Sequence, residues 1–141
     1  MARQRISSGV SWETTVGYSR AVRVGNLVFV AGTTATGPGG KLVGGSDPEA
    51  QAQAIFEKIE RALAEAGATM ADVVRTRVFL TRVEDWEAVG RAHARFFAET
   101  RPANTMLEIS RLIGDEYLVE IEADAVIEPP AAAANEHGGA G

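Results

Sequence analysis

The sequence VEIEADAV, at residues 119–126, constrains the fold of this chain more than any other segment. Acidic and apolar residues alternate in it, and successive side chains of a β-strand point to opposite faces of a sheet. Glu120, Glu122 and Asp124 therefore share one face, and the apolar residues between them share the other. A sheet with one face this acidic is either solvated on that face or covered by another subunit.

Length and composition are those of a globular protein. Of the 141 residues, 45% are hydrophobic and 23% are charged, which suits one domain at residues 1–128 with a core of ordinary size. The last residues, 129–141, read PPAAAANEHGGAG. Such a low-complexity tail has too few large apolar side chains to pack, so we expect it to be disordered.

The composition also excludes or disfavours several classes of function. The chain has no cysteine, so disulfides and thiolate sites are excluded. Its net charge of -5 disfavours a nucleic-acid partner, because no basic stripe is available to neutralise phosphates. The N-terminus lacks the apolar core of a signal peptide, and no apolar run approaches the roughly 18 residues of a membrane span. We therefore expect a cytoplasmic protein with no membrane partner.

Local signals predict the elements of the first half of the chain. Two β-strands are expected within residues 21–31, joined by a tight turn at Gly25. The first helix is expected to begin with a capping box of Ser46 and Glu49 and to end at Gly67.

The second half follows the same logic. Residues 73–80 form a strand whose alternation places on one face Val74, Thr76, Val78 and Leu80. A second capping box, Thr81 and Glu84, begins a helix that runs to Ala98. Pro102 then breaks the helix, and a closing pair of strands follows. The expected order is β-β-α-β-α-β-β. Two amphipathic helices cover only one face of such a sheet, so the predicted fold is a two-layer α+β domain with a mostly antiparallel sheet.

Four segments carry a resemblance to a known family: VGYSRAVRVGNLVFVAGTT, VVRTRVFLTRVEDW, RPANTM and LVEIEADAV. Together they resemble the RidA/YjgF family of reactive-intermediate deaminases, also called the endoribonuclease L-PSP family, over roughly residues 17–126. The resemblance implies a chorismate-mutase-like α+β fold, a homotrimer with a ligand cleft at each subunit interface, and hydrolysis of enamines and imines to keto acids and ammonia. It implies no cofactor and no metal.

The resemblance also assigns expected roles to single residues. Tyr18 and Gly32 match residues that line the family's cleft, and Glu120 matches the glutamate that positions the attacking water. Asn104 stands where the deaminases carry an arginine that grips the substrate carboxylate, and Gly90 stands where they carry an asparagine. Asparagine offers hydrogen bonds but no charge, so the chain resembles a branch that lacks the clamping arginine.

Two residues keep alternative interpretations at this point. Arg101 is a substrate-binding candidate that replaces the missing clamp, as Arg20 and Arg111 also are, but a cation there also suits the end of a helix. Glu120 is either a general base or a cross-strand partner of Arg75 or Arg77.

Three hypotheses about function follow. The first is a homotrimeric hydrolase of small imines or enamines, with Glu120 holding the water and Asn104 contacting the polar end of the substrate. The second is a non-catalytic trimer that binds a metabolite or an enzyme partner. The third, an endoribonuclease, is disfavoured by the acidic net charge. His93 is expected to pack inside the helix layer, and its distance in sequence from His137 gives no metal-ligand spacing.

Overall fold

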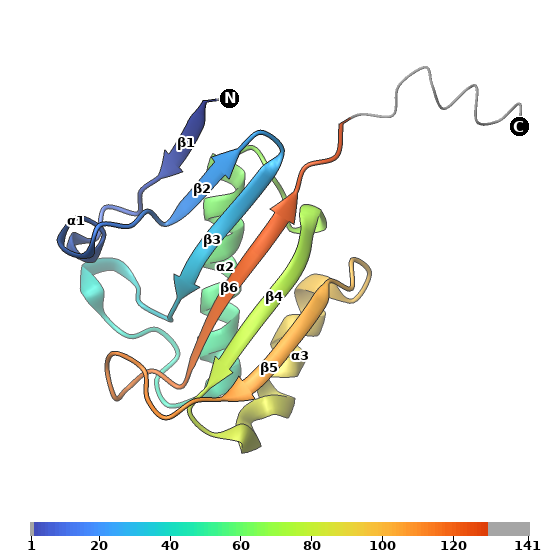
Figure 1. The fold of residues 1–141 in the computed structure, drawn as a ribbon. Coiled ribbons are helices and arrows are strands. Elements are labelled where there is room, and N and C mark those ends of the chain that lie inside the picture. The colour runs from blue at the N-terminus through green and yellow to red at the C-terminus, as the bar shows by residue number, and fades with distance from the viewer. Residues whose placement is uncertain (1, 130–141) are drawn as a thin grey trace, which may run out of the picture.

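A computed structural model describes residues 2–129 and shows one sheet with two long helices behind it (Figure 1). Nearly all of the expected tail, residues 130–141, lies outside the described residues. Between them the described residues form β1 (Arg3–Ile6), α1 (Ser11–Val16), β2 (Ala21–Val24), β3 (Leu27–Thr33), α2 (Pro48–Glu65), β4 (Val73–Leu80), α3 (Trp86–Phe97), β5 (Ala103–Glu108) and β6 (Val119–Val126).

The strands lie in the order β1-β2-β3-β6-β4-β5. Neighbouring strands are antiparallel except β4 and β5, which run parallel. The closing strands β5 and β6 are therefore not neighbours, because β4 lies between them. The sequence interpretation also missed β1 and α1. β1 pairs only with β2 at the edge of the sheet, and Ile6 is its one buried residue, so an alternating pattern is hardly visible there.

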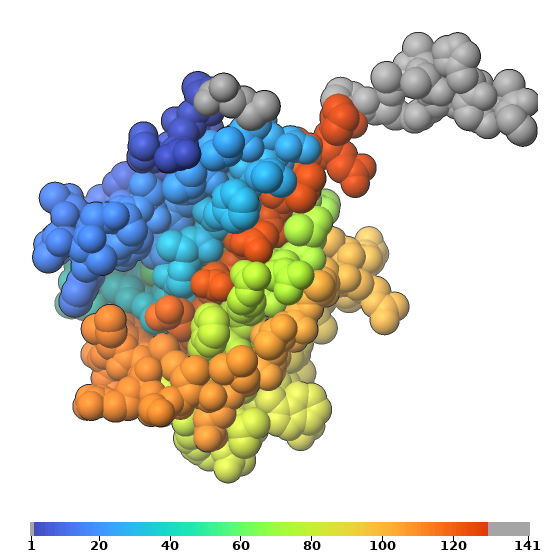
Figure 2. Space-filling model, in the orientation of Figure 1, coloured from blue at the N-terminus to red at the C-terminus, as the bar shows by residue number. Residues whose placement is uncertain are grey.

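Both long helices cover the same face of the sheet, and the hydrophobic core fills the space between the two layers. The opposite face, turned toward the viewer in Figures 1 and 2, carries no helix. This arrangement confirms the predicted two-layer α+β fold of the chorismate-mutase-like type. The largest fully buried side chains are those of Phe56, Ile55, Ile59, Leu63, Leu80 and Ile121.

The strand β4 departs from simple alternation at its beginning. Its register against β6 shifts between Val73 and Arg75, which marks a β-bulge. The extra residue leaves Val73 buried and Val74 47% exposed, so the expectation that Val74 shares the inner face was wrong. From Thr76 onward the alternation holds.

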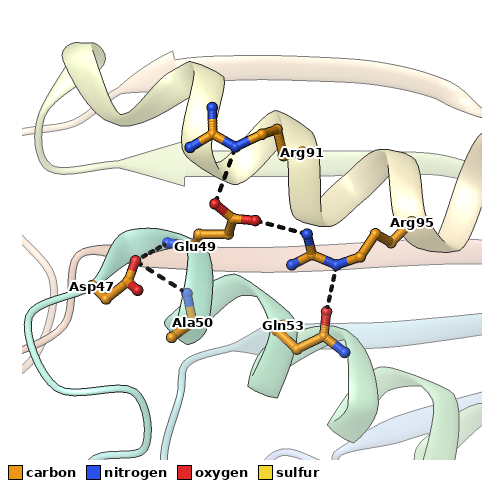
Figure 3. Close-up of polar contacts among 6 residues, drawn as sticks. All are labelled: Asp47, Glu49, Ala50, Gln53, Arg91 and Arg95. Atoms are coloured by element: carbon orange, nitrogen blue, oxygen red, sulfur yellow. Dashed lines mark hydrogen bonds and ion pairs between the residues drawn. The ribbon is translucent and has the colours of Figure 1, made fainter.

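The helix α2 begins one residue later than expected. Asp47, not Ser46, is its N-cap, and the Asp47 carboxylate accepts hydrogen bonds from the backbone amides of Glu49 and Ala50 at 2.9 and 3.4 Å (Figure 3). The Glu49 side chain is then free to contact α3, where it forms ion pairs with Arg91 and Arg95 (Figure 3).

Of the other two predicted helix ends, the structure confirms the end of α2 but not the capping box before α3. Gly67 follows α2 with a φ of 85°, which confirms the left-handed cap. Before α3 a short 3-10 turn at Val83–Asp85 stands where the second capping box was expected, and no side-chain cap bond forms there. In residues 2–129 no helix is long and apolar enough to cross a membrane.

Candidate functional site

A large cleft of about 1310 Å³ opens beside the end of β3. There β3 continues past its pairing with β2, which begins only at Ala21, so no neighbouring strand covers its last residues on that side. The walls come from the segment around α1, the loop after β3, the helix α2 and the loop before β6. In Figure 2 the blue N-terminal residues and the orange residues before β6 stand on either side of the cyan end of β3.

Glu120 and Gly32 meet in this cleft. Glu120 lies on β6, on the face without helices, next to the end of β3. A Cβ atom at Gly32 would collide with the Glu120 carboxylate oxygen Oε2 and lie 3.1 Å from its Cδ. Gly32 therefore leaves the space that the Glu120 side chain occupies. The register of β3 against β6 shifts between Val30 and Thr33, and this irregularity brings the two residues together.

Burial and nearby charges both act on the pKa of the Glu120 carboxyl. Its side chain is half-buried, and this burial raises the pKa of the carboxyl above its ordinary value, while the Arg20 guanidinium lowers it and Glu122 raises it further. Neither predicted cross-strand partner holds Glu120. Arg77 forms its ion pairs with Glu122 and Asp124, at 3.1 and 3.2 Å. The acidic row is thus divided: Glu122 and Asp124 pair with Arg77, whereas Glu120, which lines the cleft together with Glu122, does not.

Arg20 supplies the positive charge that acts on this carboxylate. Only 8% of Arg20 is exposed, and its guanidinium donates a hydrogen bond of 2.5 Å to the Gly32 carbonyl. The guanidinium also lies 5.9 Å from the centre of the Tyr18 ring. Its Nε has no hydrogen-bond partner among the described residues. Burial lowers the pKa of Arg20, and the charges of Tyr18, Glu13 and Glu120 counteract that effect. Arg20 therefore joins Tyr18, Gly32 and Glu120 in one place.

The far wall of the cleft is polar as well. Thr36 donates a 2.9 Å hydrogen bond to the Tyr117 hydroxyl, which ties the loop after β3 to the loop before β6. Lys58, on α2, donates a 2.8 Å hydrogen bond to the Thr34 carbonyl. The sequence interpretation missed both pairs, because nothing in the local pattern of α2 shows that Lys58 turns toward a distant loop.

Two predicted site residues lie elsewhere in the chain. Asn104, on β5, donates a 2.9 Å hydrogen bond to the Thr76 hydroxyl, which is itself 2.8 Å from His93 Nε2 on α3. Asn104 is thus engaged with the helix layer. Arg101 is exposed just before β5, has a φ of 50°, and donates its backbone N–H to Phe97. Neither Asn104 nor Arg101 lines the cleft of its own chain.

The remaining candidates are less involved. His93 packs between aromatic rings of the helix layer, 5.5 Å from Phe56 and 4.7 Å from Phe97, as expected. Arg111 lies outside the cleft and pairs with Asp115 at the exposed surface. A Cβ at Gly90 would meet nothing within 4 Å. Within residues 2–129 no group of three or more acidic or histidine side chains is arranged to hold a metal ion.

The protein is thus a two-layer α+β domain with one open sheet face and a half-buried glutamate in an edge cleft, and comparison with known proteins identifies its family. The endoribonuclease L-PSP family model matches residues 9–127. The chain is 42% identical over 124 residues to an uncharacterised protein of Streptomyces coelicolor, covering 88% of this chain and 92% of that one. It is 39% identical to a RutC family protein of Pyrococcus abyssi, covering 79% and 87% of the two chains.

A solved structure agrees with these relatives. A member of the YjgF/YER057c/UK114 family from Mycobacterium tuberculosis is 48% identical to this chain and superposes on it with a TM-score of 0.82. The match covers 89% of this chain and 100% of the other. The chain therefore belongs to the RidA/YjgF family, the family of the endoribonuclease L-PSP model.

Proposed function

We propose that the protein hydrolyses small imines and enamines in this cleft, releasing a carbonyl compound and ammonia. The observation that carries the proposal is the placement of Glu120, a half-buried carboxyl that contacts Gly32 and has no ion pair with Arg75 or Arg77 in the described part of the chain. A structural carboxylate is expected to pair with a cation, as Glu122 does. A carboxyl held apart from such a pair suits proton transfer.

The proposed reaction needs water and one acid–base group. The water oxygen bonds to the carbon of the C=N group while Glu120 takes the water proton. The resulting carbinolamine carries an OH and an amino group on one carbon. Glu120 passes the water proton to the nitrogen, which completes the amino group, and then moves the hydroxyl proton to the same nitrogen, so that the C–N bond breaks, ammonia leaves and the C=O bond forms. A carboxyl whose pKa is raised toward neutrality by burial is a better base for this step than an exposed one.

The neighbours of Glu120 have supporting roles in this proposal. Arg20 favours the anionic form of Glu120, which is the form that accepts a proton. Tyr18, 37% exposed, bounds the cleft. The residues present supply all the chemistry that the reaction needs, so the proposal includes no metal and no organic cofactor.

The proposal also includes a homotrimer. The sheet face without helices carries exposed apolar side chains, among them Leu27 at 40%, Phe29 at 47% and Val74 at 47%. Such residues on one face favour coverage by another subunit. Asn104 and Arg101 would then contact a ligand from a neighbouring subunit. Sedimentation equilibrium tests this part, and a monomer at micromolar concentration would contradict it.

The test of the reaction is ammonia release from imines made in situ by an amino-acid oxidase or an amine oxidase. We expect the wild-type protein to accelerate release and Glu120→Gln to lower the rate by about 10²–10⁴-fold. The control is Glu60→Gln, which removes the same charge from an exposed site on α2 outside the cleft. A wild-type rate equal to the buffer rate, for both anionic and uncharged imines, would contradict the proposal.

One observation favours a second candidate, a non-catalytic binding protein. Asn104 is engaged with Thr76 and leaves the cleft of its own chain without the residue expected to replace the clamp. In that case ligand binding survives Glu120→Gln and the wild-type protein releases no ammonia. The family model's name describes an endoribonuclease, and strong RNA binding at physiological salt would favour that activity over both.

A further inference from the structure

The chain has two lysines, Lys41 and Lys58, among its 14 basic residues. Lys41 is exposed in the loop after β3. Lys58 is half-buried and lines the cleft that holds Glu120. A primary amine differs from a guanidinium in one chemical respect that matters here: it condenses with carbonyl carbons to form Schiff bases. The placement of Lys58 in this chain is therefore of chemical interest.

The surroundings of Lys58 disfavour a positive charge. Arg20 and Arg61 line the same cleft close enough for their charges to act on the Lys58 ammonium. In the part of the chain that the structure describes, no carboxylate forms an ion pair with Lys58. Among residues 2–129, its one hydrogen bond goes to the neutral Thr34 carbonyl, at 2.8 Å. A lysine that is partly desolvated and close to other cations is activated as a nucleophile.

The pKa of the Lys58 amine follows from these surroundings. Burial lowers it from its ordinary value to about 8, with further lowering by Arg20 and Arg61. At pH 7 roughly a tenth of the amine is then neutral, against about one part in 2,500 for an unperturbed lysine. The neutral fraction is the one that attacks carbon.

Lys58 and the proposed base line the same cleft. Its Nζ donates a hydrogen bond to the carbonyl of Thr34. Thr34 follows Gly32 by two residues, so their Cα atoms are at most about 7 Å apart. Gly32 in turn contacts the Glu120 carboxyl. The Arg20 charge acts on both Lys58 and Glu120. An amine and a carboxyl thus line the same cleft, and the charge of one guanidinium acts on both.

We propose, as a deepening of the imine hydrolysis proposed above, that Lys58 is a covalent catalytic residue that forms a Schiff base with the substrate carbon, so that the water held by Glu120 attacks this lysine imine in place of the substrate imine. The neutral amine adds to the C=N carbon of the substrate, and ammonia leaves as the lysine imine forms. Water, deprotonated by Glu120, then adds to that imine. Glu120 passes the water proton to the lysine nitrogen, which gives the carbinolamine. The hydroxyl proton then moves through Glu120 to the same nitrogen, the C–N bond breaks, and the carbonyl product and the free lysine amine result.

Reductive trapping tests the Schiff base. The protein is incubated with pyruvate or propanal and sodium cyanoborohydride, which reduces an imine to a stable secondary amine, and the adducts are located by peptide mass spectrometry. We expect labelling of Lys58 to exceed that of Lys41 by about tenfold or more, because more of the Lys58 amine is neutral. Labelling of Lys58 at or below the level of Lys41 would overturn the proposal.

Steady-state kinetics supply the second readout. Lys58→Arg keeps the positive charge and a donor for Thr34 but removes the nucleophile, and Lys41→Arg is the matched control. We expect Lys58→Arg to lower kcat for ammonia release by about 10²-fold and Lys41→Arg to leave it unchanged. A wild-type kcat in Lys58→Arg overturns the Schiff base while the hydrolase proposal stands. Selective labelling of Lys58 in a protein that releases no ammonia supports the reactive amine and contradicts the hydrolase.

Discussion

The contact between Gly32 and Glu120 leads to a prediction that concerns the free energy of unfolding. The three heavy atoms nearest to a Cβ at Gly32 all belong to Glu120, with Cδ at 3.1 Å and Cγ at 3.4 Å. Gly32 is not among the residues with positive φ, so alanine fits its backbone without strain. The cost of Gly32→Ala therefore comes from the Glu120 side chain alone. Forcing one extra methyl against it costs about 1–3 kcal/mol, and the lower half of that range applies because the end of a glutamate side chain rotates.

The sign of this effect depends on Glu120. In the Glu120→Ala background the methyl group meets no carboxyl, and replacing glycine by alanine then stabilises by about 0.4–1 kcal/mol through the unfolded chain. We thus expect Gly32→Ala to destabilise the wild type and to stabilise Glu120→Ala, with a coupling energy of about 1–3 kcal/mol.

The assay is urea denaturation of the four proteins of this double-mutant cycle at one pH and one protein concentration, because any subunit association makes stability depend on concentration. Equal changes in unfolding free energy on adding Gly32→Ala to the two backgrounds would refute the contact. As an independent readout, Gly32→Ala alone should lower ammonia release by about 10²-fold, since it displaces the proposed base by an ångström or more.

Three further predictions concern stability away from Glu120. Burial lowers the pKa of His93, so at acidic pH the folded state binds fewer protons than the unfolded one. The free energy of unfolding is therefore full above the ordinary histidine pKa, about 6.5, and falls as the pH decreases below it. Urea denaturation at a series of pH values should show this loss in the wild type and not in His93→Gln. Gln51 is fully buried and forms hydrogen bonds of 2.7–3.0 Å with three backbone groups of two loops. Gln51→Leu should therefore lower the free energy of unfolding by about 3 kcal/mol, whereas Gln53→Leu, at a less buried position on α2, should lower it by less than about 1 kcal/mol. Asp47→Ala should lower the free energy of unfolding, measured by thermal melting, by about 1 kcal/mol, and Ser46→Ala should leave it almost unchanged. A larger loss for Ser46→Ala than for Asp47→Ala would contradict the assignment of Asp47 as the N-cap.

Features that depend on residues close in sequence could be predicted well. The alternation in β6 placed Glu120 on the face opposite the helices, because a period of two fixes the side of every residue in a regular strand. Boundaries were less secure. Ser46 and Asp47 are both good N-cap residues, and which one caps α2 depends on the path of the preceding loop. The bulge that turns Val74 outward arises from pairing with β6, which the sequence of β4 does not encode by itself.

The composition of the cleft depends on contacts between distant segments. Lys58 reads as a surface residue beside the buried stripe of α2, and only the path of the loop after β3 brings the Thr34 carbonyl to it. Asn104 was expected beside a ligand through the family resemblance, and this expectation stays a prediction. The parallel pairing of β5 with β4 places Asn104 opposite Thr76, to which it donates a hydrogen bond, and outside the cleft of its own chain. Arg101 was the arginine predicted to bind substrate, with Arg20 and Arg111 as further possibilities, but of the three only Arg20 lines the cleft of its own chain.

The most direct test of the account is the ratio of kcat/KM for ammonia release between wild type and Glu120→Gln, measured from about pH 8 down to about pH 4. This ratio cancels the titration of the substrate and of every group that the two proteins share. A base must be ionised, and the pKa of Glu120 is raised by burial, so the ratio should be about 10²–10⁴ at neutral pH and should fall toward one as Glu120 is protonated and comes to resemble glutamine. A ratio close to one at neutral pH, or one that does not change with pH, would contradict the role of Glu120.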